Sequence, residues 1–129
     1  MKYLLDTCTF LWMIGEDNCL SKNAVTIIED VKNELFLSVV SVQEMIVKVS
    51  RGKLKLPGDL QSIIDNELNT EKSIKSLDML FKHCFVLLNL PYHHKDPSDR
   101  MLISQAIAED MTLITSDENI HKYNVKVLW

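Results

Sequence analysis

The chain is poor in the residues that interrupt or cross-link a fold. Its 129 residues include only three glycines, three prolines and three cysteines. So few chain breakers do not suit a disordered chain, and a hydrophobic fraction of 47% is enough to form a core. The cysteines, Cys8, Cys19 and Cys84, are odd in number and lack C-x-x-C spacing, which disfavours a disulfide framework or a zinc site. We expect one domain over residues 1–129 with reduced, structural thiols.

Long hydrophobic runs and excess positive charge are also missing. No stretch approaches the roughly 20 apolar residues that cross a bilayer, because Asp6 breaks the N-terminal run and Pro91 ends FVLLNLPY. The N-terminus also lacks the small-residue cleavage site of a signal peptide. We therefore expect a cytoplasmic protein without a membrane partner. The net charge of -4 argues against a general nucleic-acid coat but suits an enzyme whose acids gather around metal ions.

Short apolar runs alternate with amphipathic stretches along the chain. This alternation predicts an α/β fold whose parallel strands are joined by right-handed crossovers. Asp96 and Pro97 are typical of a helix start, and Ser41 with Glu44 suggests a capping box for another helix that ends near Gly52. We expect strands at residues 2–5, 35–40, 73–77, 111–115 and 125–129, and further helices at 7–14, 21–31, 60–69 and 78–88, with Asp78 capping the last.

Three acids, Asp6, Glu44 and Asp117, follow predicted strands closely, and a fourth, Asp99, lies at the start of a predicted helix. In open parallel sheets, ligand sites form beyond the carboxyl ends of the strands, so these side chains could converge. Carboxylates packed together repel one another, and a cation would relieve that repulsion. Oxygen ligands suit Mg²⁺ or Mn²⁺, which bind through carboxylates, waters and substrate phosphate. The arrangement predicts hydrolysis of a phosphodiester by a metal-activated water, with one or two ions.

Other polar residues could assist these acids. Thr115 or Ser116 could bond a water or phosphate, and Arg100 could pair with an acid or a phosphate. A cluster of cations follows Glu44, and it is either a grip for an RNA backbone or a solvated helix face. The cluster comprises Lys48, Arg51, Lys53 and Lys55. His93 and His94 could contact RNA or tune the site, although packing is the commoner role of a loop histidine.

Each acid also has a purely structural explanation. Asp6 and Asp117 could be N-caps, Glu44 the acid of a capping box, and Asp99 a favourable first-turn residue. A non-catalytic binding module, whose acids only cap helices, therefore stays open and predicts no dependence on metal. A phosphatase or a phospho-acceptor receiver domain is a further alternative, but no matching lysine follows the fourth strand.

Four segments, taken in this order, resemble the PIN-domain family and more narrowly its VapC-type toxin ribonucleases. The segments are LLDTCTFLW, LSVVSVQEMIVKVSRGKLKLP, LPYHHKDPSDRMLISQAI and LITSDENIHKYNVKVLW. They cover nearly the whole chain. The resemblance implies a three-layer α/β/α sandwich around a parallel sheet of roughly four to five strands. It also implies Mg²⁺- or Mn²⁺-dependent cleavage of RNA.

The resemblance assigns the site residue by residue. The DT junction gives Asp6, the SVQE helix start gives Glu44, DPSDR gives Asp99, and TSD gives Asp117. Asp96 becomes the helix cap and an accessory group. The resemblance further implies a homodimer and a small antitoxin protein that blocks the cleft. The chain departs from the family pattern at Ser98, where members often have an aromatic residue, and at Cys8, where they often have His or Asn.

Overall fold

Parallel strands form the centre of the molecule. The computed structural model describes residues 1–15, 19–69 and 74–129. Its five strands form one sheet in the order β3-β2-β1-β4-β5, and every neighbouring pair is parallel. The strands are β1 (Lys2–Leu5), β2 (Glu34–Ser38), β3 (Lys75–Leu77), β4 (Thr112–Ile114) and β5 (Val127–Leu128). The α/β prediction and its parallel sheet are confirmed.

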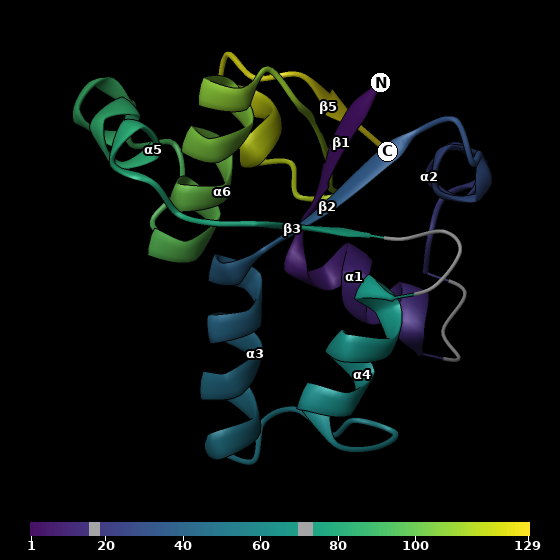
Figure 1. Cartoon of the computed structure of the whole chain (residues 1–129). Coiled ribbons are helices and arrows are strands. Elements are labelled where there is room, and N and C mark those ends of the chain that lie inside the picture. The colour runs from purple at the N-terminus through teal and green to yellow at the C-terminus, as the bar shows by residue number, and fades with distance from the viewer. Residues whose placement is uncertain (16–18, 70–73) are drawn as a thin grey trace.

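Helices connect the strands and cover both faces of the sheet (Figure 1). The α-helices in the described ranges are α1 (Thr7–Ile14), α2 (Lys22–Glu29), α3 (Val39–Ser50), α4 (Leu60–Leu68), α5 (Phe81–Val86) and α6 (Pro97–Glu109). Two short 3₁₀ helices, η1 (Leu87–Asn89) and η2 (Ile120–Lys122), complete them. None of the described helices is long and apolar enough to span a membrane. The result is the α/β/α sandwich that the resemblance implied.

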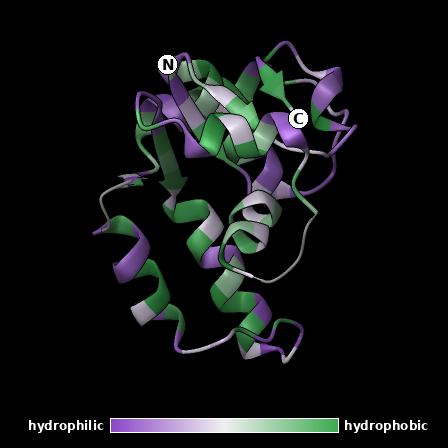
Figure 2. Ribbon diagram, turned by 90° about the vertical axis from the view of Figure 1, so that its right-hand side faces the viewer, coloured by the Kyte–Doolittle hydropathy of each residue, from purple (hydrophilic) through white to green (hydrophobic). Residues whose placement is uncertain are grey.

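Alternate residues of β1 enter different cores. Tyr3 and Leu5 of β1 join the cluster that contains Phe10 of α1 and Ala24 of α2. Leu4, between them, joins the cluster that contains Leu102 of α6. Figure 2 shows hydrophobic residues along the strands, whereas hydrophobic and hydrophilic residues alternate along the helices. Both faces of the sheet are therefore buried, as is usual for parallel sheets.

The register of the strands brings three strand-to-helix junctions to one edge. Leu5 lies opposite both Leu37 of β2 and Ile114 of β4. The backbone N–H of Asp6 then donates to the Ile114 carbonyl at 3.2 Å. Because all strands run the same way, residues that follow them emerge at the same carboxyl edge. The fold thus places Asp6 beside the chain that leaves β4.

Helix α3 begins three residues earlier than the capping-box prediction. Its N-cap is Ser38, whose hydroxyl accepts from the Val40 N–H at 3.0 Å. Ser41 is buried inside the helix, where its hydroxyl accepts from the Thr7 hydroxyl at 3.0 Å. The predicted capping box was therefore wrong, and Glu44 lies in the second turn without a capping role.

The start of α5 also differs from the prediction. The helix follows Leu80, so Asp78 does not cap it, and the Leu80 N–H donates to Nδ1 of the buried His83 at 2.9 Å. The Asp78 carbonyl instead accepts from Gln105 of α6 at 3.2 Å. Of the predicted strand at residues 73–77, Ser73 lies outside the described residues, and 75–77 form β3.

Candidate active site

Asp6 is the most buried acid at the carboxyl edge of the sheet. It follows β1 and caps α1, with its Oδ1 accepting from the Thr9 N–H at 2.7 Å. Only 6% of the residue is exposed. Burial raises the pKa of Asp6 above its ordinary value of 3.8, although hydrogen bonds from Thr115 and Thr9 oppose the rise. The sequence prediction that Asp6 is an N-cap is confirmed, yet its surroundings still make its charge costly.

Asp99 and Glu44 face the same region from α6 and α3. Asp99 lies in the first turn of α6, behind the N-cap Asp96, whose Oδ1 accepts from the Asp99 N–H at 3.2 Å. Burial, followed by the nearby charge of Asp96, raises the pKa of Asp99 from 3.8 to about 7. The side chain of Glu44 is 15% exposed and lies 3.7 Å from Lys48 Nζ. Lys48 partly balances Glu44, whereas no lysine or arginine among the described residues pairs with Asp99.

Asp117 joins the group from the loop after β4. Its Oδ1 accepts from the Asn119 N–H at 2.9 Å, and its backbone N–H donates to Thr115 Oγ1 at 3.1 Å. These bonds form a tight turn rather than the start of an α-helix. The Oδ2 of Asp117 lies 2.8 Å from His94 Nε2, and Asp99 Oδ2 lies 3.0 Å from the same nitrogen. A single imidazole therefore links the two carboxylates.

Two overlapping sets of side chains present atoms that could hold an ion. The sets are His94 with Asp99 and Asp117, and Glu44 with Asp96 and Asp99. Within each set, one ligand atom from each residue lies within 4.8 Å of the others. Asp99 belongs to both sets. Asp6 belongs to neither, but its charge and that of Asp117 interact closely enough to affect its pKa.

Buried hydroxyl groups fix these junctions relative to one another. The Thr7 hydroxyl donates to Ser41, which ties the start of α1 to α3. The Thr9 hydroxyl donates to the Ile114 carbonyl at 2.9 Å, which ties α1 to β4. The Ser38 hydroxyl donates to Gln105 Oε1 at 2.7 Å, which ties α3 to α6. The acids are thus mounted on helices whose relative positions are fixed by buried hydrogen bonds.

The predicted accessory residues divide into two groups. Thr115 is buried and bonds both Asp6 and Asp117, whereas Ser116 is exposed beside them. Arg100 is 7% exposed and donates to the Pro91 and Leu90 carbonyls and to the Tyr123 hydroxyl. Its guanidinium also lies 3.9 Å from the centre of the Tyr92 ring. Among the described side chains Arg100 pairs with no acid, so it braces a loop instead.

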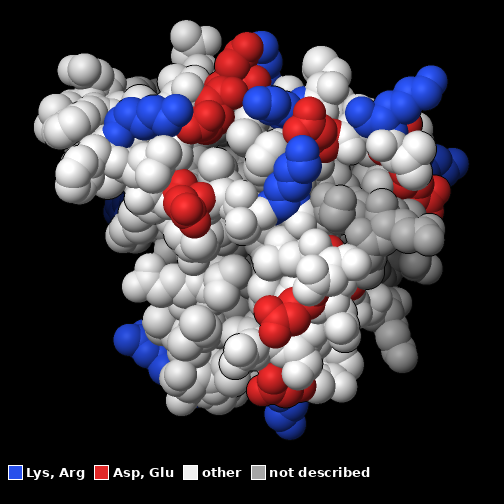
Figure 3. Space-filling view, in the orientation of Figure 1, with Lys and Arg blue, Asp and Glu red and all other residues white. Residues whose placement is uncertain are grey.

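A groove of about 380 Å³ runs from the acids along α3. Glu44 and Asp96 line it at one side, and three of the predicted cations line it too, namely Lys48, Arg51 and Lys53. Lys55, the fourth predicted cation, is exposed but does not line this groove. Figure 3 shows one face of the molecule, on which charges of both signs are interspersed without a broad basic area. Any electrostatic attraction at the site therefore comes from the cations beside the acids rather than from the charge of the whole surface.

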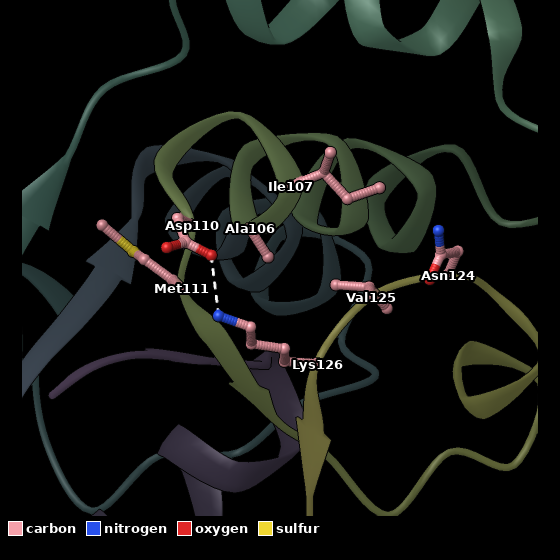
Figure 4. A pocket seen from close by; sticks show the side chains of 7 residues that line it. All are labelled: Ala106, Ile107, Asp110, Met111, Asn124, Val125 and Lys126. Carbon is pink, nitrogen blue, oxygen red and sulfur yellow. Dashed lines mark hydrogen bonds and ion pairs between the residues drawn. The ribbon is translucent and has the colours of Figure 1, made fainter.

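A second pocket lies at the opposite, amino-terminal edge of β4 and β5 (Figure 4). It measures about 300 Å³ and contains an ion pair between Asp110 Oδ1 and Lys126 Nζ at 2.8 Å. Asp110 is the acid among its lining residues, and the lysine already neutralises it. This pocket has no clustered ligand atoms and is not the candidate site.

The sequence named His94 as a residue that could tune the site, but it did not predict which acids His94 contacts. Its imidazole is 13% exposed and contacts two of the four predicted acids, whereas His93 next to it packs edge-on against Tyr123. The available signal was the short spacing between His94 and Asp99 in HKDPSD. That spacing could not show the contact, because a loop and a helix cap separate the two residues.

The three cysteines are free, as predicted, but all three are exposed rather than part of the core. Cys8 lies near the acids, since Asp6, Glu44 and Asp99 all influence its thiol. Although the residue as a whole is exposed, partial desolvation of its thiol and the charge of Asp6 raise the pKa of Cys8 above its ordinary value. The thiol is therefore kept protonated and weakly reactive.

The sequence profile of the PIN domain family matches residues 3–126. The chain belongs to the PIN domain family. Asp6, Glu44, Asp99 and Asp117 all fall within the matched part of this PIN domain. No curated protein matches the sequence.

Solved structures share the fold of this PIN domain. The chain resembles one in the crystal structure of VapBC2 from Rickettsia felis bound to a DNA fragment from their promoter, with 23% identity, 99% and 98% of the two chains covered, and a TM-score of 0.75. It also resembles chains in FitAcB from Neisseria gonorrhoeae (18% identity, 98% and 96% covered, TM-score 0.68) and in DNA-bound VapBC from Salmonella typhimurium (14%, 99% and 97%, 0.70). At these identities the likeness concerns the fold.

The donor set of this PIN domain fits a divalent cation. Asp99 has carboxylate oxygens of Glu44 and Asp96 within reach in one set and that of Asp117 in the other, and burial raises the pKa of Asp99 to about 7. A cation nearby would favour the ionised form and so reverse that rise. The acidic cluster is therefore consistent with metal binding.

Proposed function

We propose that this PIN domain is an endoribonuclease that depends on Mg²⁺ or Mn²⁺ and holds its metal through Asp6, Glu44, Asp99 and Asp117. The observation that carries the proposal is the position of Asp99, which shares one set of ligand atoms with Glu44 and another with Asp117. Sets rich in carboxylates, as these two are, suit hard cations that also bind waters and phosphate. We propose that residues 1–129 act as one nuclease domain.

The metal would supply an activated water and a positive charge that polarises the phosphoryl group. Asp6 and Asp117 hold their carboxylates through backbone bonds, to Thr9 and Asn119 respectively. Asp96 lies beside Asp99, and the carboxylate lone pairs that it does not use for capping make it an accessory group. The exposed Ser116 hydroxyl, next to Asp117, is available to a phosphate oxygen.

The groove along α3 is the proposed path of the RNA backbone. Arg51 and Lys53 are exposed in its lining, while Lys48 already lies beside Glu44. Exposed cations next to a metal site attract phosphates and contribute affinity that does not depend on base sequence. We therefore assign Lys48 and Arg51 to substrate binding rather than to catalysis.

The proposed partners follow from the VapC-type resemblance. We propose a toxin of a toxin-antitoxin pair, acting on RNA in the cytoplasm and blocked by a small antitoxin protein. We also propose a homodimer. Phe81, Phe85 and Leu88 on α5 and η1 are 83%, 66% and 80% exposed. Phe81 and Phe85 lie four residues apart on one face of α5, Leu88 follows on η1, and two-fold pairing would bury this surface against its copy.

The position of Glu44 also weighs against a module whose acids only cap helices. Because Ser38 caps α3, Glu44 has no capping role there, yet its side chain is largely buried beside Asp99. An acid kept near other acids without a capping role is typical of a functional site.

The test is cleavage of a mixed-sequence RNA by the purified chain with Mg²⁺ or Mn²⁺, and with EDTA. We expect cleavage that EDTA stops, and a loss of about a hundredfold or more in Glu44→Gln and Asp117→Asn. Asp110→Asn is the matched control, because Asp110 lies at the opposite edge of the sheet and asparagine tolerates its left-handed backbone (φ 53°). Cleavage that survives EDTA, or that equals wild type in both site variants, would refute the proposal.

A further inference from the structure

We propose that His94 is a positioning residue, which donates its Nε2–H to Asp99 and Asp117 and holds their carboxylates for the metal. The proposal rests on the proposed function, because it gives a role to a residue beside the metal site. Its basis is the pair of distances from Nε2, which are 3.0 Å to Asp99 Oδ2 and 2.8 Å to Asp117 Oδ2.

The other ring nitrogen of His94 fixes where the proton lies. The backbone N–H of Asp96 donates to His94 Nδ1 at 3.0 Å. A backbone N–H can only donate, so Nδ1 must be the acceptor and carries no proton. The proton of the neutral ring is then on Nε2, which faces the two carboxylates.

This arrangement is the reverse of a metal-binding histidine. A ligating imidazole offers a lone pair to the metal and donates its other N–H to a carboxylate or carbonyl. If His94 Nε2 bound a metal, the proton would move to Nδ1 and face the Asp96 N–H, so that two donors would oppose each other. The structure therefore assigns His94 to the carboxylates and not to the metal, although its Nε2 belongs to one of the two sets of possible ligand atoms.

Each carboxylate keeps capacity for a metal when His94 is bound. An ionised carboxylate has two oxygens and about four lone-pair sites, and the imidazole takes one site on each Oδ2. Hydrogen bonds of this kind orient metal-binding carboxylates, and their loss commonly weakens metal affinity by about ten- to a hundredfold. They also offset the repulsion between two anions from different elements, here α6 and the loop after β4.

Hydrogen bonds to Tyr123 and Arg100 fix the loop that carries His94. The Tyr123 hydroxyl accepts from the backbone N–H groups of His93 and His94 at 3.0 and 2.9 Å, and from Arg100 Nη1 at 3.1 Å. Arg100 also donates to the Pro91 carbonyl at 2.6 Å. Tyr123 is 5% exposed, so water does not compete for these bonds. The imidazole is thus fixed from two sides, at its backbone and at Nδ1.

The His94→Gln variant distinguishes a positioning role of residue 94 from a metal-binding role. The amide N–H₂ of the glutamine can replace the Nε2–H donor, whereas its nitrogen cannot serve as a metal ligand. Alanine removes both abilities. His93→Ala is the matched control, because His93 is exposed and contacts Tyr123 but none of the acids.

The experiment measures Mn²⁺ affinity by calorimetry without RNA, and cleavage of RNA as separate kcat and KM values. We expect His94→Ala to bind Mn²⁺ about tenfold more weakly with a lower kcat and little change in KM, and His94→Gln and His93→Ala to stay within about threefold of wild type. Nitrogen NMR of the metal-free chain should show the proton of His94 on Nε2. This measurement does not require a variant that folds.

Three results would overturn the role of His94. They are wild-type affinity in a folded His94→Ala variant, equal losses in the glutamine and alanine variants, and a proton on Nδ1 in the metal-free chain. A wild-type chain that neither binds Mn²⁺ nor cleaves RNA would instead overturn the proposed function. Normal binding and cleavage by wild type and His94→Ala alike would overturn only the inference.

Discussion

Asp99→Asn should stabilise the metal-free protein while abolishing its response to metal. Burial and the charge of Asp96 raise the pKa of Asp99 from 3.8 to about 7, so the ionised carboxylate is unfavourable in the folded chain. Each pH unit of displacement corresponds to about 1.4 kcal/mol, which gives an upper bound of about 4 kcal/mol. Because 21% of the side chain is exposed, solvent screening reduces this, and we expect a gain of about 2 kcal/mol above pH 7.

The sign of the pH dependence follows from proton binding. Between the ordinary pKa of 3.8 and the folded value of about 7, the folded chain keeps a proton on Asp99 that the unfolded chain has lost. The free energy of unfolding therefore falls as pH rises through this window, and the asparagine variant should lack that part of the fall. Metal affinity of the wild type should rise over the same window, because protons compete for the carboxylate.

Urea unfolding in EDTA, repeated from pH 5 to pH 8, checks this reasoning. Wild type and Asp99→Asn should differ more at pH 8 than at pH 5, and added Mn²⁺ should stabilise only the wild type. Asp110→Asn is the control, because Lys126 holds the pKa of Asp110 below its ordinary value. No other acid is among the residues that line the pocket of Asp110. A metal-free Asp99→Asn protein that is less stable than wild type at pH 8 would refute the argument.

Four further predictions test other parts of the structure. Ser38→Ala should lower the free energy of unfolding by about 2 kcal/mol, since it removes a cap and a buried hydrogen bond, whereas Glu44→Gln should leave it nearly unchanged in urea unfolding. Arg100→Lys should cost about 2 to 3 kcal/mol by the same assay, because lysine cannot reach both carbonyls, and a neutral result would contradict the brace. Arg51→Ala should raise KM for RNA and reduce the salt slope of binding by about one, and an unchanged slope would remove it from the RNA path. Phe81→Glu should give monomers in light scattering if wild type is dimeric, and a dimeric variant would move the interface elsewhere.

Local sequence was sufficient to predict where a helix starts wherever a single residue determines the backbone conformation at that start. Asp96 followed by Pro97 predicted the start of α6, and Asp6 was found as the cap of α1. The start of α3 was not decided locally, because Ser38 and Ser41 both suit an N-cap. Ser38 takes the role, and its hydroxyl also binds Gln105 from a helix more than sixty residues later. Such a partner has no signature in the neighbouring residues.

The sequence could propose the acids together because three of them, Asp6, Glu44 and Asp117, follow parallel strands and Asp99 starts a helix. His94 and Arg100 follow no such rule. A charged arginine near acids predicts a surface ion pair, but Arg100 is buried under the loop that it braces, and its bonds are to carbonyls. Whether a polar side chain reaches an acid, a phosphate or a carbonyl depends on how the loops cross in the folded chain. The periodicity of apolar residues along the sequence does not encode this.

The central place of β1 has a consequence for synthesis of the protein. Although β1 is the first strand made, its partner on one side is β4, and the Thr9 hydroxyl bonds the carbonyl of Ile114, 105 residues away. During translation, Asp6 emerges from the ribosome long before Asp117. The sheet cannot close around β1, and the acids cannot meet, until the segment that contains Ile114 has left the exit tunnel. Translation thus withholds the candidate nuclease centre from the nascent chain, whatever other control the protein is under.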